Sequence, residues 1–196
     1  MSLQKPNQED QRKIHAEINQ IINQRFLLIT IAITVFGFAT TWMLPEKIPN
    51  KNDPIGGLAC TGAIIFSIIL FVLYFVSHNL KNTQRIFSTY LLVTKASGWE
   101  QDWKEFREEK YFAYRKPQTI VFLILNAVIT AFPFILAFIY SLKFEPIIGL
   151  LACGITGSFI ELLILLMGFC DLFDSENKTE SRWERLNRIN TSSSDD

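Results

Sequence analysis

Four long apolar segments dominate the hydrophobic pattern of the chain. Each is roughly 20 residues long, which is the length that a helix needs to cross a hydrocarbon core about 30 Å thick. Three of the segments contain no charged side chain, and the fourth contains only Glu161. A soluble core helix seldom runs so far without a polar face. The pattern therefore predicts four transmembrane helices, at Phe26–Leu44, Ile55–Val76, Ile120–Leu142 and Ile147–Cys170.

The polar segments carry shorter apolar stripes at helical spacing. Ile14 and Ile18 share a face that leads into the first span, and Ile86 and Tyr90 continue a stripe after the second. Ser97, with a glutamate three residues later, fits a capping box that opens a further helix. We therefore expect an all-α fold, namely a four-helix transmembrane bundle of two out-and-back hairpins with amphipathic helices on one side of the membrane.

Basic residues indicate which side that is. Of the 19 Lys and Arg residues, sixteen lie in the two terminal segments and the segment between the second and third spans. Only three lie in the two short connections. Positive residues favour the cytoplasmic side, so the sequence predicts a multi-pass protein of the cell inner membrane with both termini cytoplasmic. Trp42 and Tyr140 then fall near the outer interface and Tyr74 near the inner one, as an aromatic belt would place them.

The same pattern sets the expected division of the chain. Its parts are a cytoplasmic amphipathic arm (1–25), a first transmembrane hairpin (26–76), a cytoplasmic helical segment (77–119), a second transmembrane hairpin (120–170) and a cytoplasmic tail (171–196).

The second hairpin partly repeats the first. The segment that begins at Pro54 resembles the one that begins at Pro146, at a constant offset of 92 positions. A true duplication would be a parallel repeat about an axis along the membrane normal, because both halves start on the same side. The alternative is chance matching within the limited alphabet of membrane spans.

Small residues recur at four-residue spacing in the second and fourth spans. Such ridges let helix backbones approach closely in lipid. They fit packing within one bundle, or self-association into a homo-oligomer. The two ridges are Ala59, Ala63 and Ser67, and Gly149, Cys153 and Gly157.

Glu161 is the one ionisable residue inside a predicted span. An ionisable group at this depth is costly and marks a functional candidate. Asn126 falls at a similar depth in the third span, and Pro133 in that span is able to kink the helix. One interpretation is a polar pair that lines a pore or forms a gating contact. The other is a single inter-helical hydrogen bond made by a protonated Glu161.

The middle segment holds the candidate ligand-binding residues. Aromatic rings and guanidinium groups there could stack on and neutralise a small phosphate-bearing ligand. The alternative is an amphipathic helix lying against the inner leaflet. The candidates are Arg85, Trp99, Trp103, Arg107 and Arg115.

The sequence shows no catalytic motif and no clustered metal ligands, so we expect no enzyme, no metal and no resident cofactor. Lys+Arg and Asp+Glu balance at 19 each, which indicates no nucleic-acid polymer as partner. The expected partners are the lipid bilayer and further copies of the chain.

In its plan the chain resembles the small four-span effectors of bacterial anti-phage signalling. The shared features are four spans, cytoplasmic termini, a charged helical middle segment and no enzyme motif. The nearest type is the transmembrane effector of Pycsar, with CBASS-type membrane effectors as cousins. The resemblance implies a membrane-impairing effector of abortive infection, activated by a cyclic nucleotide from a neighbouring cyclase. It assigns no role to any residue, because no specific motif is shared.

Two other classes of function fit the same sequence. One is a small channel or transporter, or an accessory subunit of one, with Glu161, Asn126 and Pro133 along the pathway. The other is a membrane scaffold or assembly factor.

Overall fold

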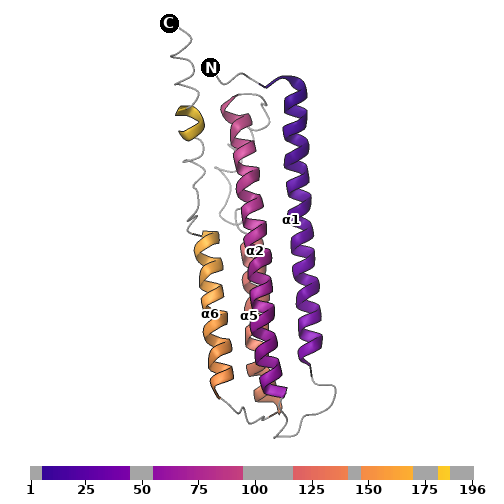
Figure 1. Cartoon of the computed structure of the whole chain (residues 1–196), viewed down its shortest axis with the longest axis vertical. Helices are drawn as coiled ribbons and strands as arrows, with labels where there is room; N and C mark the ends of the chain where they lie inside the picture. The colour runs from indigo at the N-terminus through magenta and orange to yellow at the C-terminus, as the bar shows by residue number, and fades with distance from the viewer. Residues whose placement is uncertain (1–5, 45–54, 95–116, 141–146, 170–180, 186–196) are drawn as a thin grey trace. The chain divides into compact units, whose positions relative to one another are not determined.

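The computed structural model describes residues 6–44, 55–94, 117–140, 147–169 and 181–185. Residues 181–185 form a short helix, and no strand occurs in these ranges, so the expected all-α class is confirmed. The rest of the described chain is four long helices, α1 (Gln8–Met43), α2 (Ile55–Val93), α5 (Pro117–Tyr140) and α6 (Ile147–Phe169), drawn in Figure 1.

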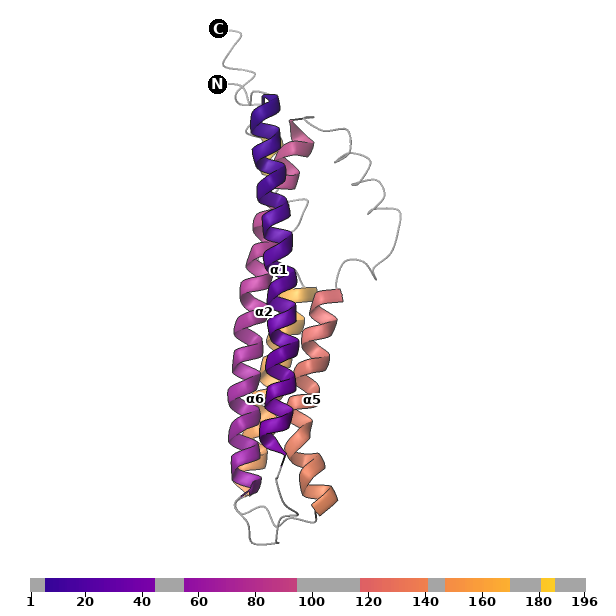
Figure 2. The ribbon, with the colours of Figure 1, turned by 90° about the vertical axis from the view of Figure 1, so that its right-hand side faces the viewer.

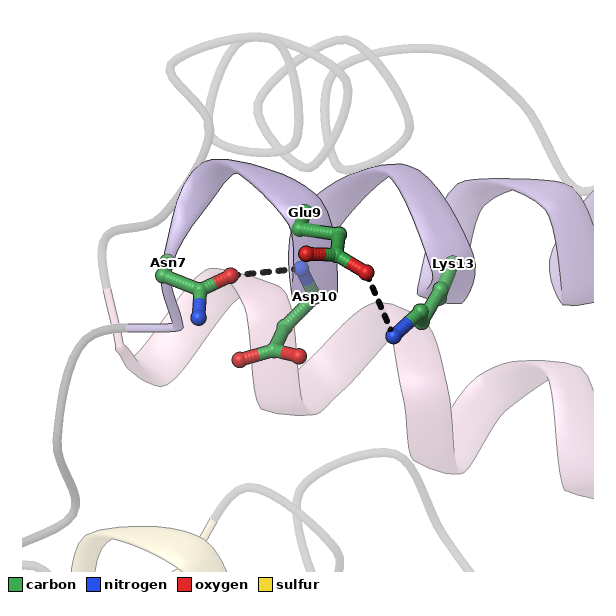
Figure 3. Close-up of polar contacts among 4 residues, drawn as sticks. All are labelled: Asn7, Glu9, Asp10 and Lys13. Carbon is green, nitrogen blue, oxygen red and sulfur yellow. Dashed lines mark hydrogen bonds and ion pairs between the residues drawn. The ribbon is translucent and has the colours of Figure 1, made fainter.

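The first turn of α1 is fixed by polar side chains. The side-chain oxygen of Asn7 accepts a hydrogen bond from the backbone N–H of Asp10 at 2.8 Å, which caps the helix start (Figure 3). Two acidic residues, Glu9 and Asp10, lie in this turn, where the helix dipole favours negative charge. Glu9 also pairs with Lys13 one turn later, with 2.9 Å between the charged atoms.

α1 and α2 are longer than the spans predicted within them. They contain 36 and 39 residues, whereas α5 and α6 contain 24 and 23. Each of the two long helices runs from its apolar part into the neighbouring polar segment as one helix. The predicted stripes before the first span and after the second therefore belong to the same helices as the spans.

The chain forms two compact units, and α1 and α2 contribute to both. The apolar unit consists of Leu27–Val76 and Lys116–Cys170. The polar unit consists of Met1–Phe26, Ser77–Arg115 and Asp171–Asp196.

In the apolar unit the four helices lie side by side (Figures 1 and 2). α2 and α6 run in the same direction, because Cys60 lies beside Gly149 near one end and Tyr74 contacts Ile164 near the other. α5 runs against α6, since Phe134 lies nearest Gly154 while the far earlier Thr119 lies nearest Gly168. This arrangement is the expected bundle of antiparallel hairpins.

The outer faces of this unit are as apolar as its core. Large side chains such as Phe138 and Ile155 remain 88% and 70% exposed. All four helices are long and apolar enough to cross a membrane. Moving apolar surface from water into lipid is favourable by about 25 cal/mol per Å², so these exposed faces are much more stable in a membrane than in water. The protein is therefore a multi-pass integral membrane protein.

The polar unit joins its segments through a few specific contacts. Arg25 of α1 donates a hydrogen bond from its guanidinium to the side-chain oxygen of Gln84 of α2 at 2.8 Å. Burial lowers the pKa of Arg25 from its usual value, although a guanidinium stays charged in proteins. Tyr90 of α2 packs on Trp183 of the short helix, with ring centroids 5.1 Å apart.

Candidate functional site

Three helices of the apolar unit meet at the hydroxyl of Tyr74. Its oxygen lies 3.3 Å from the backbone carbonyl oxygen of Ile164 in α6, to which it donates. It also lies 3.3 Å from the hydroxyl of Thr119 in α5, and either hydroxyl can be the donor of that bond. The Tyr74 ring packs edge-on against Phe122 of α5 at a centroid distance of 5.4 Å. We call Tyr74, Thr119 and Ile164 the tyrosine contact.

The aromatic-belt expectation for Tyr74 is therefore wrong, because the side chain is 1% exposed and points into the bundle. A phenol in the bundle interior must find hydrogen-bond partners there, and α5 and α6 supply both. Trp42 is 45% exposed, and its place at the outer interface stays a prediction.

Gly168 allows the close packing at the tyrosine contact. A Cβ at this position would meet the Thr119 side chain and would lie 2.7 Å from the Tyr74 hydroxyl oxygen. Any larger residue must therefore displace one of these two groups.

Asn126 forms a second inter-helical contact, further along α5. Its side-chain N–H₂ donates to the backbone carbonyl oxygen of Gly157 in α6 at 3.4 Å. The residue is completely buried, and its side-chain oxygen has no hydrogen-bond partner among the described residues. A buried amide that is only half satisfied costs free energy in a bundle where lipid offers no water.

Thr130 fills the space beside Gly157. A Cβ added to Gly157 would meet the methyl group of Thr130 and would lie 2.8 Å from its Cβ. The backbone carbonyl of Thr130 accepts a weak hydrogen bond from the thiol of Cys153, with 3.8 Å between sulfur and oxygen. Both contacts bring α5 and α6 together around Asn126.

Glu161 lies one turn after Gly157 and is partly exposed. Gly157 faces Thr130 and Gly168 faces Thr119 across the antiparallel pair α5 and α6. Four residues further along α6 therefore correspond to four residues back along α5, which places Glu161 level with Asn126. Within the described ranges, however, no hydrogen bond or ion pair joins Glu161 to another residue. The similar depth of Glu161 and Asn126 is thus observed, and the functional pairing of the two stays a prediction.

Pro133 is fully buried and lies inside α5, which continues past it to Tyr140. It shares the inward face of the helix with Asn126 and Ile129, which is also fully buried. A role for Pro133 in gating stays a prediction.

The two ridges of small residues are used inside the chain. Ala59, Ala63 and Ser67 are at most 2% exposed, and Cys153 is fully buried. A Cβ added to Gly149 would lie 3.9 Å from the Cβ of Cys60, which is ordinary contact between α6 and α2. This packing favours the intra-bundle interpretation, and self-association stays a prediction.

Of the candidate ligand-binding residues, only Arg85 lies in the described chain, where it is partly buried in the polar unit. Trp99, Trp103, Arg107 and Arg115 lie outside the described residues. Within the described ranges, no three His, Cys, Asp or Glu side chains are placed to hold a metal ion.

Comparison with known proteins does not identify the chain. No protein-family model matches it, no curated protein is similar to it, and no solved structure matches its fold.

Sequence reasoning found Asn126 and Glu161 because polar residues stand out in apolar spans. It missed the partnerships of Thr119 and Gly168, and placed Tyr74 at an interface. A weak signal existed, since Ser67, Leu70 and Tyr74 recur on one face of α2 at spacings of three and four residues.

Proposed function

We propose that this membrane protein is a membrane-impairing effector of a bacterial antiviral system, held inactive until a cyclic nucleotide appears. The proposal places it in the cell inner membrane with both termini cytoplasmic. In the active state the transmembrane bundle rearranges, as a homo-oligomer, and the membrane loses its barrier.

The observation that carries the proposal is the continuity of α1 and α2. Both helices are uninterrupted between the polar residues on one side and the apolar residues on the other. A ligand shifts a two-state equilibrium only through its different affinity for the two states. If the ligand binds the polar unit differently in the two states, a movement of α1 or α2 there also moves the span, because both are parts of one continuous helix.

The contacts between spans also suit a rearrangement. The tyrosine contact and the Asn126–Gly157 bond have lengths of 3.3 to 3.4 Å, at the long end for hydrogen bonds. Inter-helical hydrogen bonds in membranes contribute only about 0.6 kcal/mol on average. Replacing them in a second arrangement therefore costs little.

A disulfide between α2 and α6 tests the proposal. A cysteine at Gly149 would bring its Cβ to 3.9 Å from that of Cys60, within the range of a disulfide. In the Gly149→Cys variant, with Cys153 and Cys170 changed to alanine, oxidation by copper phenanthroline should link the two helices. The matched control is Gly37→Cys in the same background, because Gly37 lies in α1 and the added Cβ meets nothing within 4 Å.

The readout is membrane-potential dye fluorescence in cells that also express a nucleotide cyclase encoded beside this protein, challenged with phage. We expect depolarisation with the reduced protein, none with the linked protein, and recovery after reduction. Protection of the cells with an intact potential would show that membrane impairment is the wrong mechanism. Depolarisation that persists with α2 and α6 linked would show that these helices do not separate.

A channel or transport component is the second candidate. It is favoured by the fully buried and only half-satisfied Asn126 in the middle of α5, because polar groups inside a bundle often line a solute path. Ion flux through reconstituted vesicles without any nucleotide would place this function ahead. A stable complex with another membrane protein on pull-down, without flux or depolarisation, would instead favour a scaffold.

A further inference from the structure

Two polar atoms are buried in the apolar unit without a hydrogen-bond partner among the described residues. They are the hydroxyl oxygen of Ser67 in α2 and the side-chain oxygen of Asn126 in α5. Both side chains are 0% exposed. Each unsatisfied group costs about 1–3 kcal/mol, and lipid around the bundle cannot relieve it.

The register of the helices places these two atoms in one layer. Tyr74 and Thr119 are in contact, and α2 and α5 run in opposite directions. Ser67 precedes Tyr74 by seven residues, and Asn126 follows Thr119 by seven residues. At 1.5 Å per residue, the backbone of Ser67 lies about 10 Å from that of Tyr74, and the backbone of Asn126 lies about 10 Å from that of Thr119, in the same direction.

α6 reaches this layer with a backbone carbonyl. Ile164 contacts the same Tyr74 hydroxyl, and Gly157 lies seven residues before Ile164, again about 10 Å along the helix. The backbone of Gly157 faces Thr130, one turn from Asn126, and its carbonyl oxygen accepts the Asn126 N–H₂ directly. The tyrosine contact and the Asn126–Gly157 bond thus agree in placing Ser67 and Asn126 in the same part of the bundle.

Both unpartnered side chains also point inward. Seven residues are almost two full turns of a helix, so Ser67 shares the face of Tyr74, and Asn126 shares the face of Thr119. Those are the faces on which α2 and α5 touch each other. The two side chains therefore approach the same space between α2, α5 and α6.

We infer that Ser67 and Asn126 form a binding site for one water molecule in the middle of the bundle. A buried water makes two to four hydrogen bonds, and the two unpartnered groups of this layer supply one donor and one acceptor. The water accepts from the Ser67 hydroxyl and donates to the Asn126 side-chain oxygen. The Gly157 carbonyl is already occupied, because it accepts the helical N–H of Glu161 and the Asn126 N–H₂. Both groups that hold the water are neutral, which suits water and not an ion.

The water site is independent of the proposed effector function. It makes this layer a hydrated junction, in which α5 bonds α6 directly through Asn126 and Gly157 but bonds α2 through a small mobile molecule. A channel, a scaffold and an effector are each compatible with it.

The test is water-to-protein magnetisation transfer, measured by solid-state NMR on the full chain with ¹⁵N-asparagine in phosphatidylethanolamine–phosphatidylglycerol bilayers. The Asn126 side-chain signal is identified by its loss in Asn126→Leu. We expect rapid transfer to this signal, comparable with that to Asn79, which is exposed in the polar unit. Transfer to Asn79 alone would overturn the proposal, because the layer would then be dry.

Two serine variants show whether Ser67 holds the water. In Ser67→Ala, transfer to Asn126 should fall to about half or less, because one of the two partners of the water is lost. Ser158→Ala is the matched control, since Ser158 lies beside Gly157 at the same depth but is exposed to lipid. Equal transfer in both variants would show that Ser67 is not part of the site.

Discussion

The hydroxyl oxygen of Tyr74 in α2 lies 3.3 Å from the backbone carbonyl oxygen of Ile164 in α6. The same oxygen reaches Thr119 of α5, so one side chain connects three of the four spans. Its closeness to Gly168 means that the packing there depends on a missing side chain.

Removing the Tyr74 hydroxyl should loosen the bundle without changing its shape. Tyr74→Phe keeps the ring against Phe122 but removes the hydroxyl that bonds Thr119 and leaves the Ile164 carbonyl with its helical hydrogen bond alone. We expect a loss of about 1 kcal/mol in the free energy of unfolding, measured by equilibrium unfolding in mixed detergent micelles. Thr61→Val is the control, because the Thr61 hydroxyl bonds only to Gly57 of its own helix. Equal effects in the two variants would mean that the tyrosine contact contributes nothing specific.

Alanine at Gly168 should destabilise the bundle, whereas alanine at Gly37 should not. The new Cβ at position 168 would overlap Thr119 and press on the Tyr74 hydroxyl. At Gly37 nothing lies within 4 Å, and the helix gains up to about 1 kcal/mol from the better propensity of alanine. Thermal unfolding in detergent should therefore show a lower midpoint for Gly168→Ala and an unchanged or higher one for Gly37→Ala. A lower unfolding midpoint for both variants would show that the loss of stability does not depend on the contacts at Gly168.

Self-association is expected in mild detergent. Its contribution can be distinguished from the packing of the small-residue ridges within one chain. Light scattering should show more than one copy per particle. Gly157→Leu should lower the stability of each protomer, because the side chain would collide with Thr130 inside the chain. A folded and equally stable Gly157→Leu protein that has become monomeric would place Gly157 at an interface between copies.

The orientation in the membrane can be measured by cysteine labelling in a cysteine-free background. Cysteines at positions 50 and 144 should react with an impermeant maleimide from outside the cell, and those at 100 and 185 only after permeabilisation. The reason is the excess of Lys and Arg in the segments that hold positions 100 and 185. Labelling of position 100 in intact cells would reverse the predicted topology.

Glu161 is expected to act in the depolarisation response through a hydrogen bond that a glutamine can also make. Glu161→Gln would then preserve the depolarisation response during phage challenge, and Glu161→Ala would alter it. If the carboxylate charge is required, both variants should change the response equally. A response that is unchanged in both would remove Glu161 from the mechanism.

The sequence predicts the spans well because lipid imposes a simple demand on composition. Twenty apolar residues in a row are hard to explain in any other way, and all four predicted segments are helical across their described parts except at Leu44, which follows the end of α1. The helical continuation into the polar segments was also readable, since Ile14 and Ile86 keep the same spacing as the spans beside them.

Which face of each span points inward was much harder to predict. The period that marks a buried face in a soluble helix disappears when lipid-facing residues are equally apolar. Ser67 and Ser158 illustrate this, because both are serines in apolar spans and yet one is buried and the other exposed. Their difference comes from side-chain packing between helices, as does the inward position of Tyr74.

The lengths of α5 and α6 set a relation between this protein and the lipids around it. With 24 and 23 residues they extend about 35 Å, a little more than a hydrocarbon core of about 30 Å. Such hydrophobic mismatch is accommodated by tilting the helices or by local thickening of the bilayer. Lipids with short acyl chains would increase the tilt, and those with long chains would reduce it. Acyl-chain length is thus a variable that should shift the balance between helix arrangements even when no ligand is bound.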